Sequence, residues 1–274
     1  MKIIKFNYHG EPMIGVMVDN YIVPLPRYSL AQIISLDQNE LKNLLAQTTI
    51  TIELTQINYE IPVDPTSKII CVGLNYHDHA LEVKKQVPDY PIFFVRYASS
   101  LVGHNESLTK PSISDKMDYE GELAVIIGRK TKNVSEQEAI DAIFGYSIFN
   151  DVTMRDYQGK STQWLVGKNF DQSGSFGPYI ITKDAIKNHD NLQITTKLNG
   201  IVMQHDSTHN MIFSISKLIS TLSQVMTLEA GDVIVTGTPS GVGYTKSPPV
   251  YLKLDDVIEV SINQVGTLIN RVNK

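Results

Sequence analysis

Two acidic residues, Glu120 and Glu122, stand one residue apart in the segment DYEGELAVIIG at 118–128. The residues after them alternate as in a strand, so both carboxylates are expected on one face, where like charges repel unless a cation or solvent separates them. Asp151, which ends the apolar run 143–150, is the best candidate for a third carboxylate. Such oxygen ligands suit Mg²⁺, Mn²⁺ or Ca²⁺ rather than Zn²⁺. Spacing alone leaves open a second interpretation, an exposed strand edge followed by an aspartate that caps a turn.

A candidate general base lies in GLNYHDHALE at 73–82, which follows an expected strand and opens a short helix. His79 and Glu82 are three residues apart and are therefore neighbours on a helix surface. A carboxylate beside an imidazole raises its pKa and orients it, as a general base requires. The pair could also be incidental on a solvated helix face. His77 is the rival base, but it has no acidic residue three or four places after it.

Further polar residues follow the third carboxylate. Arg155 and Gln158 are three apart, and Lys168 follows in GKNFD at 167–171. Together, an arginine, an amide and a lysine could stabilise an enolate or an alkoxide. The glycine-rich run TGTPSGVG at 236–243 matches neither a Walker loop nor a dinucleotide fingerprint. Its backbone N–H groups could approach a carboxylate, and a tight structural turn is the equal alternative.

The elements that must position these residues divide the chain in two. Pro62 and Pro65 disfavour both helix and central strand, so a linker at 61–66 is expected to separate a small unit, 1–65, from a larger one, 66–274. Expected elements of the small unit are strands at 2–7, 13–18 and 21–24 and a helix at 38–47 whose start carries a capping box, Asp37 with Glu40.

The larger unit is expected to be mostly β with a few inserted helices. Its predicted strands are 68–73, 92–95, 122–128, 146–150, 177–182, 193–198, 233–236 and 257–262. Its predicted helices are 135–144, where Ser135 and Glu138 form a capping box, and 215–226, which has one apolar face. Many strands with few helices indicate an α+β, mostly β fold rather than a doubly wound sheet.

Composition narrows the class of protein. The 274 residues are 42% hydrophobic and 19% charged, with a net charge of −5 and no basic run, which disfavours nucleic-acid binding. No eighteen apolar residues run together and the N-terminus lacks a signal-peptide pattern, so a cytoplasmic protein without membrane spans is expected. The lone cysteine, Cys71, lies in an apolar run and is better interpreted as a buried strand residue than as a nucleophile.

Several ordered motifs together resemble the fumarylacetoacetate hydrolase family, as a bacterial two-domain member. They are GLNYHDHALE (73–82), DYEGELAVIIG (118–128), FNDVTMRDYQ (149–158), GKNFD (167–171) and GDVIVTGTPSGVG (231–243), and the resemblance covers about residues 67–270. It implies a pseudo-β-barrel of packed sheets with the site at its mouth, a small N-terminal α/β domain and a homodimer.

The resemblance also implies a role for each candidate residue. Glu120, Glu122 and Asp151 would hold Mg²⁺ or Mn²⁺, with Ca²⁺ also able to occupy the site in crystals. The catalytic residues would be His79, Glu82, Arg155, Gln158 and Lys168, and the substrate-binding residues Tyr76, Arg96 and Thr238. Arg96 stands where many members have lysine, and a guanidinium could hold a carboxylate in two-point contact.

The expected reaction is hydrolysis of a C–C bond in a small 2-oxo or 1,3-dicarbonyl acid, of the acylpyruvate or fumarylpyruvate type met in aromatic catabolism, through a metal-stabilised enolate. The same site could serve an oxaloacetate-type decarboxylase or a 2-hydroxy-diene-dioate isomerase or hydratase, because fold does not choose among these reactions. An alternative of another class is a non-catalytic metal-binding scaffold.

Overall fold

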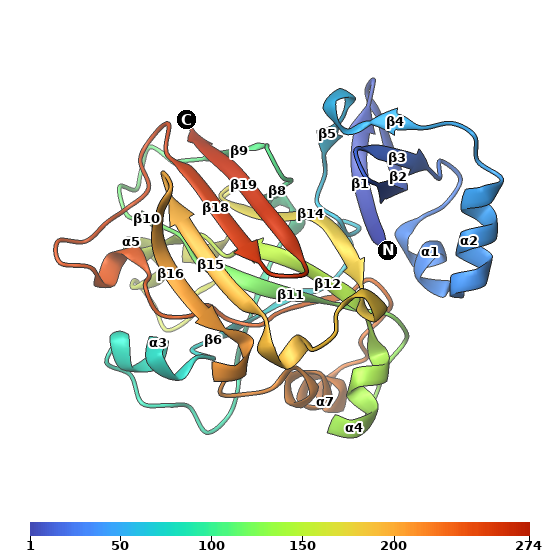
Figure 1. Ribbon diagram of the computed structural model, residues 1–274. Coiled ribbons are helices and arrows are strands. Elements are labelled where there is room, and N and C mark those ends of the chain that lie inside the picture. Colours follow the sequence, from blue (N-terminus) through green and yellow to red (C-terminus); the bar gives the residue numbers. More distant parts are fainter.

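The computed structural model describes residues 1–274 apart from the side chain of Gln38, and it shows the mostly β, α+β architecture that the sequence predicts (Figure 1). The largest sheet has the order β4 (Ile52–Glu53), β3 (Tyr21–Pro24), β2 (Glu11–Val18), β1 (Lys2–Tyr8), β14 (Gly174–Thr182), β12 (Ile143–Asn150), β11 (Gly121–Ile127), β17 (Val233–Val235), β6 (Ile69–Gly73) and β7 (Ile92–Arg96), with β5 (Asn58–Tyr59) beside β1 and β8 (Leu101–Val102) beside β14.

A second sheet packs against one face of the first. Its strands are β16 (Ile201–Ser207), β15 (Gln193–Leu198), β18 (Val257–Ile262), β19 (Gly266–Asn273) and β9 (Ser107–Thr109), and a small ribbon pairs β10 (Met117–Asp118) with β13 (Thr153–Met154). The helices are α1 (Leu30–Ser35), α2 (Gln38–Ala46), α3 (His77–Glu82), α4 (Glu136–Ala139), α5 (Arg155–Gln158), α6 (Leu165–Lys168) and α7 (Ile215–Val225).

The N-terminal unit, drawn in blue, stands beside the main body and carries α1 and α2 on its far side (Figure 1). Its sheet is nevertheless continuous with the main sheet, because β1 pairs with β14 through Lys2 with Ile181 and Ile3 with Ile180. The capping box of Asp37 with Glu40 forms as predicted. A division of the chain near residue 65 stays a prediction, since backbone hydrogen bonds join the two units.

One predicted helix, 135–144, ends earlier than expected. The capping box of Ser135 with Glu138 forms, but helical geometry stops at Ala142 and β12 begins at Ile143. The reason is tertiary: from 143 onward the backbone pairs with β11, and further along with β14. The strands β16 and β19 and the helix α1 were not predicted. The helix α1 is only six residues long, although its sequence carries a helical signal in the capping box of Ser29 with Gln32 and in the spacing of Leu30, Ile33 and Ile34.

The strand β11 is buried on both faces, which fixes where the two glutamates can point. Leu123 and Val125 pack in the core between the two sheets, and Ala124 and Ile126 pack in the core on the other side. Because side chains alternate along a strand, Glu122 belongs to the second set.

The lone cysteine, Cys71, is buried, and burial raises the pKa of its thiol, so the structure agrees with a core cysteine.

Gly121 lets the second sheet approach β11 closely. A Cβ at this position would overlap Thr196 Oγ1 and lie 3.0 Å from Val260 Cγ1, and both residues belong to the second sheet. Gly121→Ala should therefore lower the free energy of unfolding by about 1–3 kcal/mol, measured by urea denaturation. Gly159→Ala is the matched control, because its Cβ would meet its nearest atom at an ordinary 3.5 Å. Equal stability of the two variants would contradict this account.

Candidate metal centre and active site

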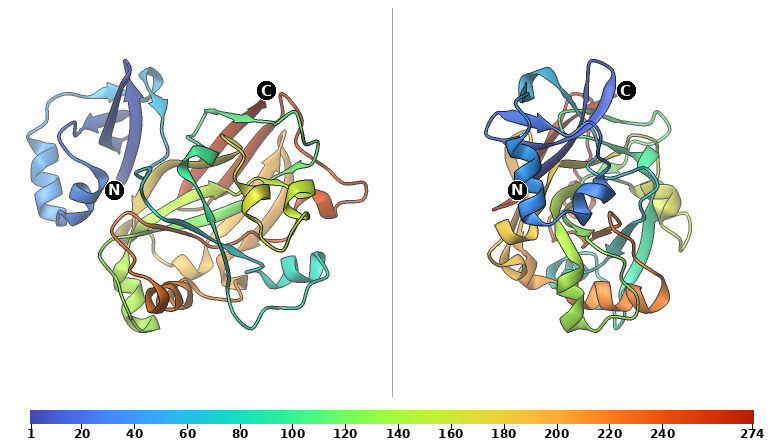
Figure 2. Two further views of the ribbon diagram at one scale, coloured as in Figure 1. Left: turned by 180° about the vertical axis from the view of Figure 1, so that it is seen from behind. Right: turned by 90° about the vertical axis from the view of Figure 1, so that its right-hand side faces the viewer.

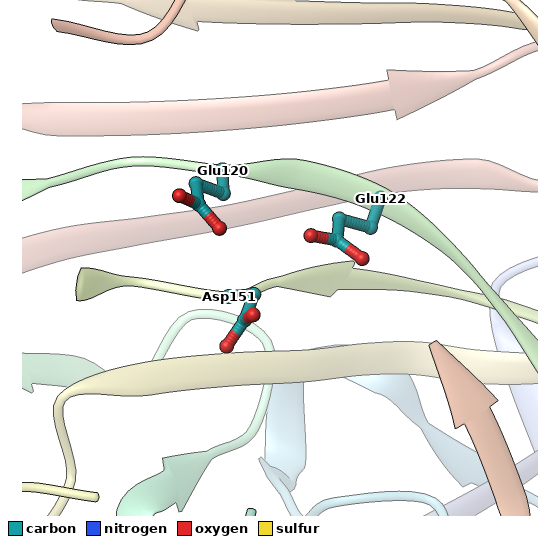
Figure 3. Close-up of side chains that lie close together, drawn as sticks. All are labelled: Glu120, Glu122 and Asp151. Carbon is teal, nitrogen blue, oxygen red and sulfur yellow. The ribbon is translucent and has the colours of Figure 1, made fainter. Parts of the chain in front are cut away.

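Three buried carboxylates meet where β11 begins and β12 ends. The two strands are antiparallel and pair Gly121 with Asn150, which sets Glu120, Glu122 and Asp151 side by side. The backbone N–H of Asp151 also donates to the carbonyl of Glu120 at 2.8 Å. Candidate ligand oxygens of the three side chains all lie within 4.8 Å of one another, and the side chains face a common space (Figure 3). This is the cluster that the spacing of the sequence suggested.

Three cations contact two of these carboxylates. Lys168 Nζ lies 2.6 Å from both Glu120 Oε2 and Asp151 Oδ2. Arg155 Nη1 lies 2.7 Å from Glu120 Oε1, and Arg96 Nη1 lies 2.8 Å from Asp151 Oδ1. Although burial alone would raise it, the pKa of Glu120 is lowered to about 2 by the charges of Lys168 and Arg155. Glu120 is therefore held as a carboxylate.

Glu122 differs from its two neighbours. Within the part of the chain that the structure describes, no ion pair reaches it, and its polar contact is the backbone N–H of Gly237 at 2.6 Å. Burial, together with the charges of Asp151 and Glu120, raises its pKa well above the usual range. A cation would stabilise the charged form of a carboxylate that lies among other carboxylates and has a raised pKa. The three carboxylates therefore fit a divalent metal ion.

The balance of charges at the site also supports a divalent metal ion. Among the described residues, the buried carboxylates here are Glu120, Glu122, Asp151 and Asp118, and the cations that contact them are Lys168, Arg96 and Arg155. With all of these groups ionised, the site carries one excess negative charge. A bound divalent cation would reverse that sign, leaving a positive site that attracts an anionic ligand.

Binding of the metal should depend on pH through Glu122. Its raised pKa means that metal-free protein holds a proton there at pH values where a free glutamate has lost it, and a metal must displace that proton. We expect the apparent Mg²⁺ affinity, measured by calorimetry, to rise with pH until Glu122 ionises in the metal-free protein. Proton release should fall over the same range. A pH-independent affinity without proton release would contradict the assignment of Glu122 as a ligand.

Lys168 should hold the metal-free fold together. Its side chain is 2% exposed, and removing its charge leaves Glu120 and Asp151 less compensated. Lys168→Met should lower the free energy of unfolding in chelator by about 3–5 kcal/mol, the usual cost of breaking a buried ion pair from one side. Mg²⁺ should recover part of this loss, because it neutralises the same carboxylates. The exposed Lys187→Met is the control, and equal denaturation curves for the two variants would refute the prediction.

The second predicted group, His79 with Glu82, lies on α3. His79 Nδ1 is 3.3 Å from Glu82 Oε2, and His79 is 6% exposed and lines the pocket beside the carboxylates. The rival, His77, is exposed on the outer side of the same helix. The buried Asn75 fixes the start of α3, because it donates to the carbonyl of Thr236 and accepts from the N–H of Phe213, both at 2.8 Å. The geometry favours His79 over His77.

A pocket of about 580 Å³ opens over the carboxylates. The segments on its two sides, α3 and the stretch with α5 and α6, lie on the same side of the main body (Figure 2). Seven of the residues predicted for the site line it: His79, Glu120, Glu122, Arg155, Gln158, Lys168 and Thr238. Four of the predicted residues are not among those that line the pocket: Asp151, Glu82, Arg96 and Tyr76.

Arg96 was expected to contact the substrate directly, and the structure places it elsewhere. Its side chain is fully buried and binds Asp151, the carbonyl of Val152 and the hydroxyls of Ser100 and Ser173. A guanidinium so engaged cannot also form a two-point contact with a substrate carboxylate. The structure therefore favours a role for Arg96 in holding Asp151.

Tyr76 and Thr238 also have surroundings that spacing could not show. Tyr76 is fully buried and is not among the residues that line the pocket, and its hydroxyl has no partner among the described residues. The hydroxyl of Thr238 donates to the carbonyl of Gly121 at 3.0 Å and accepts from Gln204 at 2.8 Å. Thr238 lines the pocket, but its hydroxyl is already engaged within the protein.

Sequence reasoning missed Asp118 and the aromatic residues of the pocket. Asp118 accepts from Arg155 Nε at 2.8 Å and from the N–H groups of Gly243 and Tyr244 at 2.8 and 3.0 Å, so it ties α5 to the glycine-rich loop. Its signal was present in the sequence, as an acidic residue just ahead of a buried strand. Trp164 and Tyr244 also line the pocket, and the ring of Tyr244 lies 4.3 Å from the Arg155 guanidinium.

A membrane span is not found in the described part of the chain, where each helix is too short or too polar to cross a bilayer.

Comparisons with known proteins agree with the geometry. The model of the family described as "Fumarylacetoacetate (FAA) hydrolase C-terminal" matches residues 68–273. The mitochondrial oxaloacetate tautomerase fahd2 of Xenopus laevis is 43% identical over 220 residues, covering 80% of this chain and 69% of that protein. Oxaloacetate tautomerase YisK of Bacillus subtilis is 41% identical over 223 residues, covering 80% and 74%. The solved structure of fumarylacetoacetate hydrolase from psychrophilic Exiguobacterium antarcticum is 36% identical with a TM-score of 0.87, covering 100% and 99%.

Proposed function

Because the chain belongs to the fumarylacetoacetate hydrolase family, we propose that it is a divalent-metal enzyme that interconverts the keto and enol forms of oxaloacetate or a similar short 2-oxo dicarboxylic acid. The observation that carries the proposal is a buried carboxylate triad and an oriented histidine in one pocket. Two relatives at 43% and 41% identity are named oxaloacetate tautomerases, which favours this reaction over C–C hydrolysis. Mg²⁺ or Mn²⁺ as the metal, a homodimer and a cytoplasmic location belong to the same proposal.

The metal would be held by Glu120, Glu122 and Asp151, where it would act as a Lewis acid toward the 2-oxo and carboxylate oxygens of the substrate. His79 is the general base. Its Nδ1 faces Glu82, so Nε2 is the nitrogen left to remove a proton from the carbon next to the 2-oxo group. Return of that proton to the resulting oxyanion gives the enol, and the reverse sequence gives the ketone, so no proton is lost overall.

Arg155 and Gln158 would bind and orient the substrate. Arg155 Nη2 is buried and has no partner among the described residues, while its other nitrogens bind Asp118, Glu120 and Gln158. An unpaired buried N–H group is costly, and a substrate carboxylate oxygen would satisfy it.

Lys168 has a different role. Burial alone would lower the pKa of Lys168, but the charges of Asp151 and Glu120 raise it, so Lys168 stays charged. It stabilises the developing oxyanion and does not act as the base.

The decisive experiment follows oxaloacetate with Mg²⁺ or Mn²⁺ and measures enol absorbance and pyruvate release together. A tautomerase speeds the approach to the keto–enol equilibrium without releasing pyruvate. Pyruvate and carbon dioxide from oxaloacetate would instead identify a decarboxylase. No acceleration of either process would refute the proposal.

Hydrolysis of acylpyruvates or fumarylpyruvate is the second candidate. The pair of His79 with Glu82 is the observation that favours it, because an oriented imidazole can equally deprotonate a water molecule. The same assay run on acylpyruvates and fumarylpyruvate detects it as release of pyruvate and a carboxylic acid. Hydrolysis faster than oxaloacetate tautomerisation would reverse our order of preference.

A further inference from the structure

One wall of the pocket is a stretch of chain, residues 77–91, that comprises α3 and the segment after it. It faces the pocket through His79, Val83 and Lys85. Its N-terminal side is anchored by the buried Asn75, and its other end leads into β7. The outer side carries exposed apolar side chains, with Leu81 69% exposed and Val87 43% exposed. Much of this wall therefore does not pack into the core.

Glu82 holds the wall to the rest of the protein. In the described structure, the backbone hydrogen bonds of residues 77–91 stay within residues 76–85. The hydrogen bonds that join this stretch to more distant parts of the chain all end on the Glu82 carboxylate. The backbone N–H of Gly241 donates to both of its oxygens, at 3.0 and 3.1 Å, and the hydroxyl of Thr245 lies 2.6 Å from Oε1. Both donors belong to the loop that follows β17.

We propose that Thr245 is a positioning residue, whose hydroxyl fixes Glu82 and, through Glu82, holds His79 and the wall 77–91 over the metal centre. The hydroxyl has one proton and two acceptors in reach, Glu82 Oε1 at 2.6 Å and the carbonyl of Val242 at 2.8 Å. A carboxylate is the stronger acceptor, so the bond to Glu82 dominates.

The second donor, Gly241, lies in a tightly packed part of the loop. Its φ of +105° lies in the left-handed region, and a Cβ there would overlap the carbonyl of Met203. Hydrogen bonds to residues outside α3 hold the loop, because the Tyr119 hydroxyl donates to the carbonyl of Gly241 at 3.2 Å and the N–H of Gly243 donates to Asp118 at 2.8 Å. With donors on both oxygens, Glu82 is held as a carboxylate that orients His79: burial alone would raise its pKa, but hydrogen bonds from His79, Thr245 and Gly241 lower it.

The kinetic part of this inference rests on the proposed function, because it assigns His79 as the base. Thr245→Val removes the hydroxyl at nearly constant shape, and we expect turnover to fall about tenfold with little change in KM, since one charge-assisted hydrogen bond that orients the base is lost. Thr245→Ser keeps a hydroxyl and should restore most of the turnover. Thr131→Val is the matched control, because this buried hydroxyl donates to the carbonyl of Arg129 far from the pocket.

The structural part is tested without any substrate, by hydrogen–deuterium exchange of the Mg²⁺-loaded protein. Thr245→Val should speed exchange in peptides from 77–91 several-fold, while Thr245→Ser and Thr131→Val leave them as in the wild type. If Thr245→Val destabilises the whole chain, Glu82→Gln must give the same local increase with Thr245 in place. Unchanged exchange in 77–91 for a folded Thr245→Val, or for Glu82→Gln where Thr245→Val does not fold, overturns the inference. Normal exchange effects in a protein without tautomerase activity would instead overturn the proposed function alone.

Discussion

Glu122→Gln is expected to reduce turnover by more than about a hundredfold, because loss of a metal ligand should exceed the 10- to 100-fold effects of changes around such ligands. Among the three carboxylates, Glu122 is the one that forms no ion pair with a described cation, so it gains most from a metal. The amide has nearly the same shape and no charge to bury. The variant should therefore fold as well as the wild type in chelator, and its melting temperature there should be equal or higher.

The metal dependence of stability distinguishes loss of the metal site from a general loss of folding. In the wild type, Mg²⁺ or Mn²⁺ should raise the melting temperature, and addition of oxalate, a chelating anion, should raise it further. Glu122→Gln should lose most of both shifts. Glu138→Gln, at an exposed helix cap remote from the pocket, is the control and should behave as the wild type. Full activity of Glu122→Gln in EDTA would rule out the metal centre as described.

The second large effect is expected at His79. Replacing it with alanine should lower kcat by about 10²- to 10⁴-fold, the usual contribution of a general base, with a smaller change in KM. Glu82→Gln should cost less, because the imidazole remains and only its orientation and charge partner change. His77→Ala, two residues away on the exposed side of α3, should leave turnover unchanged.

A comparison of these three variants identifies the base. If His79→Ala kept the tautomerase rate while losing acylpyruvate hydrolysis, the histidine would serve water activation and another group would move the substrate proton. If His77→Ala were the more damaging variant, the assignment within α3 would be wrong. Both outcomes can be measured in the oxaloacetate and acylpyruvate assays at fixed Mg²⁺.

Several features were determined by the sequence alone, because they depend on local periodicity. The alternation around Glu120 and Glu122 predicted two carboxylates on one strand face, and the structure places them together. Strands at 193–198 and 257–262 and the capping boxes of α2 and α4 also followed from local patterns. The ordered motifs indicated the family, which the family match at 68–273 confirms.

Other features depended on chain pairing, which no local pattern records. The backbone pairing of β11 with β12 brings Asp151 to the glutamates and ends the predicted helix at 135–144 early. Long-range packing also placed Arg96 behind Asp151 instead of in the pocket, and it brought Thr245 to Glu82 across more than 160 residues of sequence. Local spacing thus predicted which side chains could bind a metal. Only the tertiary structure decided which cations offset them and which hydroxyl holds the base, because those contacts form between segments remote in sequence.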